Sequence, residues 1–397
     1  MTSPTIIAEQ TYIANHYAPL PVVLVRGEGV YVWDENGKQY LDCMSGYSAL
    51  SHGHCHPKLI DALVQQAKTL SFTSRAFYHD KLAPFLKYCC ELTGQDKALP
   101  MNTGAEAVET AIKAARKWAY TVKKVPENQA ELIVCNNNFH GRTTTIVGLS
   151  SEPQYRSGFG PFAQGSITIP YGNTKALEEA ITPNTAAFLV EPIQGEAGII
   201  VPPQGYLKEC QRICQKHNVL LICDEIQTGL GRTGKLLACD HENVKPDGLL
   251  LGKALGGSLI PVSLFLSKKE VMDVFTPGDH GSTFGGNPLA SVVGLRALEV
   301  LIEEELVERA ASMGTYLLEQ LNRVNSSLIQ EVRGKGLLIG VEIAPSETTA
   351  HDLCLQLLKR GILAKDVHKK VIRLAPPLII SKEQIDTLIA VIKEVFE

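Results

Sequence analysis

Between about residue 100 and residue 280, short apolar segments alternate with segments of helical pattern. The apolar segments read ELIVC, SITIP, AAFLVE, VLLICDE and GLLLG, and helical patterns cover residues 174–181 and 205–217. Strands that alternate with helices in this way are typical of a parallel sheet with helices on its faces. This part of the chain is therefore predicted to form an α/β unit.

The two ends of the chain show a different pattern. Residues 29–44 read as two strands around an Asn36-Gly37 turn, the strongest short-range signal for a hairpin. After Pro288, helical patterns run to about residue 323, and the strands RGKGLLIGVEI and VIRLA follow with two more helices. We expect an N-terminal segment with a hairpin at 1–45, a large unit at 46–287 and a smaller α+β unit at 288–397, which the hairpin completes.

Composition excludes several classes of protein. The 397 residues carry a net charge of −4, which gives no electrostatic basis for binding nucleic acid or an anionic membrane. No apolar run approaches the length of a membrane span, and the N-terminus has no targeting pattern. The ten cysteines are scattered without a C-x-x-C pair, so we expect reduced thiols in a cytoplasmic protein.

A lysine follows an apolar strand in LLLGKALGG, where an unpaired ammonium group is costly to bury. The preceding strand, in VLLICDEIQTGLGRTG, ends in the carboxylates Asp224 and Glu225. Ligands of open α/β sheets bind at the carboxyl ends of the strands, so Asp224 and Lys253 are expected together at one sheet edge. Taken alone, such a pair is more often a structural ion pair than a catalytic one.

A candidate anion site begins the segment NTGAEAVETAIKAARKWAYTVKK, whose apolar residues recur every three or four positions. Thr103 and Gly104 at a helix start leave backbone N–H groups free at the positive end of the dipole, although many helices begin this way. A lysine, a carboxylate and an anion site together fit pyridoxal phosphate, which needs a lysine for a Schiff base, a partner for its ring nitrogen and a phosphate site.

Longer motifs carry a resemblance to a family. LLICDEIQTGLGRTGK and LLGKALGG resemble the signature of the class III pyridoxal-phosphate-dependent aminotransferases, and HGSTFGGNP resembles the family's next motif. NHYAPLP, TSRAFY and VEPIQGEAG are similar to the ornithine-specific branch of that family. The resemblance implies fold type I, with a mostly parallel sheet flanked by helices in a large domain, a smaller α+β domain, and a homodimer or higher homo-oligomer that shares its active sites.

The resemblance also implies roles for individual residues. Lys253 would form the Schiff base with pyridoxal phosphate, and Asp224 would pair with the ring nitrogen. The other expected cofactor contacts come from the following residues, the last of them reaching over from the partner subunit: Thr103, Gly104, Ala105, Phe139, Ile226, Gln227, Ser282 and Thr283.

The implied reaction transfers the δ-amino group of L-ornithine to 2-oxoglutarate and gives glutamate 5-semialdehyde and glutamate. Arg142 and Tyr17 would hold the α-carboxylate of ornithine, since a guanidinium fork suits a carboxylate. Arg373 would bind the carboxylate of 2-oxoglutarate or glutamate, and Glu196 would cover Arg373 while ornithine is bound. Tyr47 is expected beside the substrate.

Two alternatives stay open for the function. His140 stands in FHGRT, which is also similar to transaminases acting on N-acetylornithine, so that substrate or 4-aminobutyrate is the alternative, while SGYSAL and NHYAPLP favour free ornithine. A non-catalytic member of the fold would be expected to lack Lys253, Asp224 or Arg373, and all three are present.

The run SHGHCHP at 51–57 suggests a metal site by its three histidines and one cysteine. Gly53 and Pro57 indicate a turn there, and no acidic or cysteine partner lies nearby in the sequence. We therefore expect no metal ligands in this loop.

Overall fold

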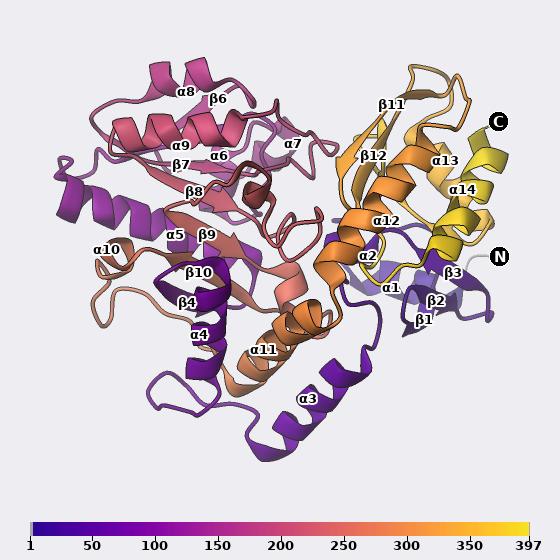
Figure 1. Cartoon of the computed structure of the whole chain (residues 1–397), viewed down its shortest axis with the longest axis horizontal. Coiled ribbons are helices and arrows are strands. Elements are labelled where there is room, and N and C mark those ends of the chain that lie inside the picture. Colours follow the sequence, from indigo (N-terminus) through magenta and orange to yellow (C-terminus); the bar gives the residue numbers. More distant parts are fainter. Residues whose placement is uncertain (1–2, 397) are drawn as a thin grey trace.

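Three sheets organise the computed structural model, which describes residues 3–396 (Figure 1). The largest has seven strands in the order β4-β10-β9-β8-β7-β5-β6. β10 runs antiparallel to β4 and β9, and the remaining neighbours pair in parallel. Its strands are β4 (Lys97–Met101), β5 (Glu131–Cys135), β6 (Ser166–Ile169), β7 (Thr185–Val190), β8 (Leu220–Asp224), β9 (Gly248–Leu251) and β10 (Ser263–Ser267).

Continuous apolar strands explain why this sheet lies between helices. Every residue of β7, TAAFLV, is buried, as expected for a parallel strand covered on both faces. Phe188 packs into the core on one face and Leu189 into the core on the other. The covering helices include α5 (Gly104–Trp118), α6 (Thr144–Leu149), α8 (Thr174–Ala180) and α9 (Tyr206–Lys216). The predicted α/β fold is confirmed.

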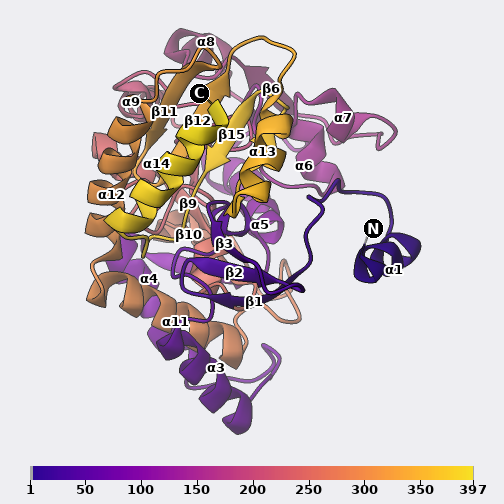
Figure 2. The ribbon, with the colours of Figure 1, turned by 90° about the vertical axis from the view of Figure 1, so that its right-hand side faces the viewer.

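The two smaller sheets come from the ends of the chain. One has the order β1-β2-β3-β13, in which β13 (Ile362–Leu363) pairs in parallel with β3 (Gln39–Asp42) beside β1 (Leu24–Glu28) and β2 (Tyr31–Asp34). The N-terminal hairpin therefore lies against C-terminal residues, as Figure 2 shows. The other is antiparallel, in the order β11-β12-β15-β14, with β11 (Ile329–Lys335), β12 (Leu338–Ile343), β14 (Lys365–Val367) and β15 (Val371–Leu374).

Helices of the second half of the chain join these units. α11 (Pro288–Glu303) packs against α3 (Pro57–Thr69) and α4 (Leu82–Thr93). α12 (Leu306–Leu321) packs on β11, α13 (Ala350–Lys359) packs on β14 and β15, and α14 (Lys382–Phe396) packs against α12 and α13. α1 (Pro4–Tyr12) buries none of its residues and stands away from the rest of the ribbon in Figure 2. The short segments are α2 (Ser45–Ser48), α7 (Pro153–Arg156) and α10 (Lys269–Met272). Within residues 3–396, no helix has the length and apolar content to cross a membrane.

Candidate active site

Lys253 and Asp224 lie at the same edge of the seven-stranded sheet, as the sequence predicts. Asp224 ends β8 and pairs with Leu250 of the parallel neighbour β9, which ends at Leu251, just before Lys253. Lys253 begins a short 3₁₀ turn, and its backbone has a φ of +44°. Burial lowers the pKa of Lys253 to about 8. About a tenth of the lysine is therefore neutral at pH 7, far more than for an ordinary lysine.

His140 holds Asp224 in place. Its Nδ1 donates to Oδ2 of Asp224 at 2.7 Å, and the backbone N–H of Ile226 donates to Oδ1 at 3.1 Å. Burial alone would lower the pKa of His140, but the hydrogen bond to Asp224 outweighs it and the pKa is raised. From the sequence, His140 was considered only as a residue that differs between branches of the family. The structure adds its hydrogen bond to Asp224, the predicted catalytic carboxylate.

A second buried carboxylate, Glu191, was missed by the sequence analysis. It follows β7, and its Oε1 accepts the backbone N–H of Phe139 at 2.9 Å. Burial raises the pKa of Glu191 to about 7. The sequence contains a pattern that could have indicated Glu191, because the apolar strand AAFLVE ends in a carboxylate just as VLLICDE does.

An arginine–glutamate pair covers another side of the site. Arg373 is 1% exposed, and its Nη1 donates to Oε1 of Glu196 at 2.5 Å. Nε2 of Gln227 donates to the same oxygen at 3.0 Å. Burial would raise the pKa of Glu196, but the charge of Arg373 lowers it to about 2, so Glu196 is ionised. The Arg373 guanidinium lies 5.0 Å from the ring centre of Tyr47.

The structure does not join Arg142 to Tyr17. Arg142 is exposed and stacks 3.8 Å from the ring centre of Tyr155 and 5.5 Å from that of Phe139. Tyr17 is 64% exposed, and no hydrogen bond between the two residues occurs in the part of the chain that the structure describes. Burial raises the pKa of Tyr47, and the nearby Tyr17 adds to the rise, so Tyr17 lies on the Tyr47 side of the site.

The start of α5 opens into the same region as Lys253. A cavity of about 460 Å³ is lined by Lys253, Thr103 and Gly104 among others. Thr103 is the N-cap of α5, and its Oγ1 accepts the N–H of Glu106 at 3.3 Å. The N–H groups of Gly104 and Ala105 have no acceptor within the helix, so they are free for an anion.

Of the two loop residues predicted to contact the phosphate, Ser282 lies beside the start of α5 and, within the described residues, Thr283 does not bond to it. Oγ of Ser282 accepts from Nδ2 of Asn102 at 2.9 Å, beside the start of α5. Thr283 is exposed and makes no hydrogen bond within residues 3–396. The single chain therefore brings Ser282, but not Thr283, to the candidate phosphate site.

The residues present fit pyridoxal phosphate. Oε1 of Gln227 is buried without a hydrogen-bond partner among the described residues, and a Cβ at Gly195 would lie 1.4 Å from it. The cofactor requires an amine, a carboxylate and an anion site. Lys253 supplies an amine of lowered pKa, Asp224 a carboxylate held by hydrogen bonds, and the start of α5 free N–H groups, while Gln227 adds an oriented amide.

The histidines of SHGHCHP bind other parts of the protein. No cluster of three or more metal-ligating side chains occurs within residues 3–396. The three rings have separate partners: His52 with the carbonyl of Ala297 at 2.9 Å, His54 with Asp42 at 2.9 Å and His56 with Glu304 at 3.3 Å.

Comparison with known proteins identifies the family. The class-III aminotransferase family model matches residues 12–396, so the chain belongs to this family and is a pyridoxal-phosphate-dependent aminotransferase. Among curated relatives, the ornithine aminotransferase of Brevibacillus brevis is 54% identical over 397 residues, 100% of this chain and 99% of the relative. That of Halalkalibacterium halodurans is 56% identical over 385 residues, 97% of this chain and 96% of the relative.

Solved structures are similar over the whole fold. The ornithine aminotransferase from Toxoplasma gondii aligns with a TM-score of 0.97 and 47% identity, covering 99% of this chain and 94% of that one. The acetylornithine aminotransferase from Elizabethkingia anophelis aligns with a TM-score of 0.90 and 49% identity, covering 99% and 98%. The predicted family, fold and cofactor are confirmed.

Proposed function

We propose that this enzyme transfers the δ-amino group of L-ornithine to 2-oxoglutarate, giving glutamate 5-semialdehyde and glutamate. Full-length identity of 54% and 56% to ornithine aminotransferases supports this substrate. The structural observation that carries the proposal is the ion pair between the buried Arg373 and the partly exposed Glu196. One site must accept a terminal amine in one half-reaction and an α-oxo acid in the other, and a carboxylate that covers and uncovers an arginine allows both.

Lys253 is the proposed covalent attachment point and proton carrier. Pyridoxal phosphate, when bound, supplies the carbonyl carbon that takes up the amino group and a ring that withdraws electrons from the substrate carbon. The lowered pKa of Lys253 makes its amine a nucleophile and, once displaced by substrate, a base that can take up and return a proton at Nζ. Asp224, held by His140, would keep the ring nitrogen protonated.

The remaining cofactor contacts would hold the group without taking part in proton transfer. Gln227 would donate to the ring's phenolic oxygen, and Phe139 and Ile226 would lie on the two ring faces. The phosphate would bind at the start of α5, where the N–H groups point outward. The residues proposed for the phosphate are Thr103, Gly104, Ala105 and Ser282, with Thr283 from a partner subunit.

Two arginines would select the two substrates. Arg142, together with Tyr17 and beside Tyr47, would bind the α-carboxylate of ornithine and direct the δ-amine toward Lys253. Arg373 would bind the oxo acid once Glu196 moves aside. The exposure of Arg142 and Tyr17 supports a position for this carboxylate at the mouth of the site.

N-acetylornithine is a second candidate substrate. The observation that favours it is the 49% identity to the acetylornithine aminotransferase from Elizabethkingia anophelis, together with FHGRT around His140. An acetyl group on the α-nitrogen leaves both the α-carboxylate and the δ-amine unchanged, so the same anchors would serve.

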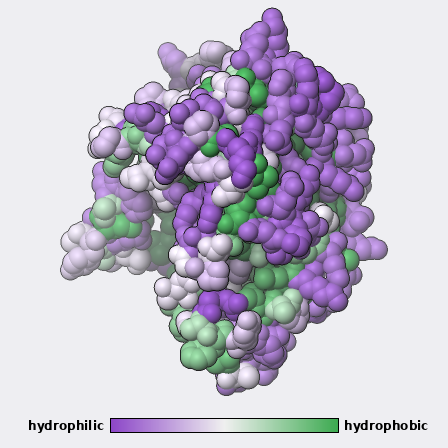
Figure 3. All heavy atoms as spheres, turned by 90° about the vertical axis from the view of Figure 1, so that its left-hand side faces the viewer, coloured by the Kyte–Doolittle hydropathy of each residue, from purple (hydrophilic) through white to green (hydrophobic). Residues whose placement is uncertain are grey.

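We propose a homodimer with shared sites, in a large domain at 46–287 and a small domain formed by 1–45 and 288–397. Apolar side chains are exposed around α3, α4 and α11, in the lower part of the molecule, where Figure 3 shows apolar residues gathering. They are Leu70, Phe72, Phe77, Tyr78 and Phe284. Burial of such a patch favours association. The ten cysteines, all within residues 3–396, are free thiols, which supports a cytoplasmic location.

Turnover with three amino donors tests the function. With 2-oxoglutarate as acceptor, we expect the highest kcat/KM for ornithine, ahead of N-acetylornithine and 4-aminobutyrate. Higher kcat/KM for either competitor contradicts the proposed substrate. Borohydride should abolish the visible absorption of the wild-type holoenzyme, and Lys253→Ala should lack the borohydride-trapped adduct.

A further inference from the structure

Arg333, Gly340 and Arg373 form one row across the antiparallel sheet. Arg333 on β11 pairs with Gly340 on β12, and Gly340 pairs with Arg373 on β15. Directly paired residues of neighbouring strands project to the same face, so the two arginines flank a residue without a side chain. Loop 194–200 occupies the space over Gly340. A Cβ there would lie 3.1 Å from Cβ of Ile199 and 3.2 Å from the carbonyl oxygen of Gly198.

Each arginine of the row bonds to one side of loop 194–200. Arg373 donates to the carboxylate of Glu196. Nε of Arg333 donates to the carbonyls of Gly198 at 3.2 Å and Ile199 at 3.1 Å, and its Nη2 donates to Gly198 at 2.8 Å. A planar guanidinium presents fixed donors, so it holds two adjacent carbonyls more rigidly than an ammonium could.

The loop is strained where Arg333 holds it. The φ of Gly198 is +107° and that of Ile199 is +57°. The left-handed region is unfavourable for a β-branched residue such as isoleucine, and this conformation persists only where the surroundings impose it. Gln194 and Ile200 exchange backbone hydrogen bonds of 3.1 and 3.0 Å at the base of the loop. Within the loop, the N–H groups of Gly198 and Ile199 donate to the carbonyl of Gly195 at 3.2 and 3.3 Å. The bonds from Arg333 add a restraint on the carbonyls of the same two residues from outside the loop.

We propose that Arg333 is a positioning residue that holds loop 194–200 in the conformation in which Glu196 covers Arg373. This inference rests on the proposed function, in which Arg373 binds the carboxylate of the oxo acid. The side chain of Glu196 is 24% exposed and that of Arg373 is 1% exposed, so the carboxylate lies on the open side of the pair. Glu196 leaves by rotation toward solvent while the loop backbone stays fixed. Arg333 thereby sets how strongly Glu196 competes with an incoming carboxylate.

Binding of glutarate, an unreactive dicarboxylate, to the holoenzyme tests this role by titration calorimetry. Arg333→Met removes the bonds to the loop and keeps an unbranched side chain. The strained loop then relaxes, Glu196 covers Arg373 less of the time, and the Kd for glutarate falls roughly fivefold. Hydrogen exchange of peptides within 194–200 accelerates in the same variant. Unchanged or weaker glutarate binding overturns the proposal.

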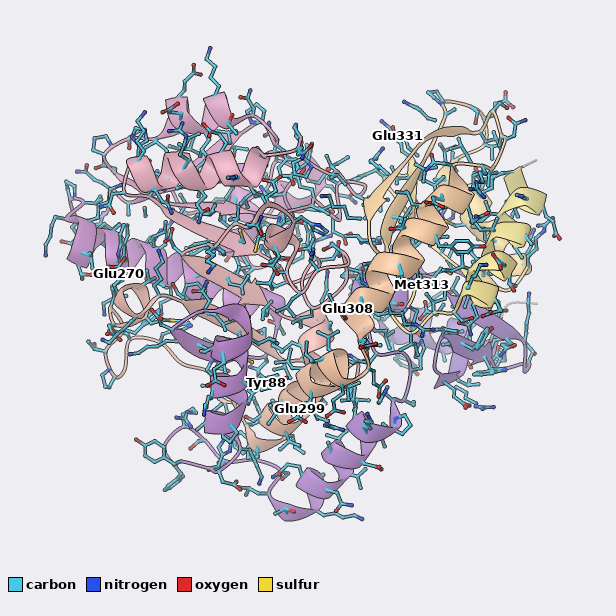
Figure 4. The ribbon with its side chains drawn as sticks, in the orientation of Figure 1. Tyr88, Glu270, Glu299, Glu308, Met313 and Glu331 are labelled. Carbon is cyan, nitrogen blue, oxygen red and sulfur yellow. The ribbon has the colours of Figure 1, made fainter. Side chains whose placement is uncertain are left out.

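Two further variants sharpen the result. Gly340→Ala adds a Cβ that lies 3.1 Å from both Ile199 and Val371, so it crowds the loop while Arg333 stays intact. This variant should also tighten glutarate binding, and it replaces Arg333→Met if that variant does not fold. Glu331→Gln is the matched control. Glu331 lies on β11 (Figure 4), and its carboxylate accepts from Nη1 of Arg333 at 2.6 Å, but its side chain is 56% exposed. Glu331→Gln should leave the Kd unchanged, and an effect equal to that of Arg333→Met overturns the loop-based explanation.

Arg373→Met separates this inference from the proposed function. If Arg373→Met abolishes glutarate binding while Arg333→Met and Gly340→Ala leave it unchanged, only the positioning role is overturned. If glutarate binding survives Arg373→Met, the proposed carboxylate site itself is wrong. Loss of binding in Arg373→Met with tighter binding in Arg333→Met supports both.

Discussion

Lys253 and Tyr47 have backbone conformations that residues with side chains rarely adopt. Their φ angles are +44° and +60°. Such conformations cost of the order of 1–3 kcal/mol each and concentrate at functional sites, because the fold must supply the energy to maintain them. Tyr47 lies in a left-handed turn at α2, next to Arg373, and Lys253 is separated from the end of β9 only by Gly252. Strain at both positions directs these side chains into the site.

The rate at which the apoenzyme takes up pyridoxal phosphate should rise with pH and level off above about pH 8. Only the neutral amine of Lys253 is nucleophilic, and burial lowers its pKa to about 8, so the neutral form grows as pH rises through that value. Stopped-flow absorbance measures the rate. Free Nα-acetyl-lysine, with an amine pKa of about 10.4, is the control and should keep accelerating to higher pH. A rate for the apoenzyme that follows the control contradicts a depressed pKa.

At the scale of elements, the start of α5 serves both helix capping and anion binding. Oε2 of Glu106 accepts the N–H groups of Asn102 at 2.9 Å and Thr103 at 2.7 Å, which completes a capping box. The carboxylate of Glu106 therefore bonds to residues that precede the helix and not to the N–H groups of Gly104 and Ala105. Gly104 and Ala105 keep their N–H groups for an incoming anion, so the cap stabilises the helix without blocking the site.

Thr103→Ala should lower the stability of the apoenzyme by about 1 kcal/mol, the usual cost of losing a threonine N-cap. The alanine cannot accept the N–H of Glu106, which leaves that group unpaired. Urea unfolding of the apoenzyme measures the change without interference from the cofactor. Thr103→Ser keeps the hydroxyl and should unfold close to wild type. Equal loss in both variants would show that packing of the threonine methyl, and not the cap, is responsible.

At the scale of the whole molecule, the single chain leaves one part of the proposed site open. Thr283 is exposed near the apolar patch that includes Phe72 and Phe284, whose rings lie 4.7 Å apart. A second copy of the chain would explain both the exposed apolar patch and the open phosphate site. A second copy that covers the patch would carry its own Thr283 to the phosphate of the first.

Co-expression of two inactive variants should restore activity if the sites are shared. Lys253→Ala lacks the amine, and Thr283→Asp places a negative charge at the proposed phosphate site. A mixed dimer contains one site with Lys253 from one chain and Thr283 from the other, both wild type. Random pairing should return about a quarter of wild-type activity, and light scattering should give twice the chain mass. Each variant expressed alone is the control. Absence of restoration contradicts a shared site.

The sequence by itself determined the sheet, the family and the central chemistry. Apolar strands that end in Asp224 and precede Lys253 are local patterns, and parallel pairing of neighbouring strands necessarily brings their ends to one edge. Only the tertiary structure decided the contacts made across long sequence separations. The His140–Asp224 bond, the burial that raises the pKa of Glu191, and the row of Arg333, Gly340 and Arg373 depend on strand register and packing between units. Local pattern fixes which residues face the core, whereas register and burial fix which polar groups meet.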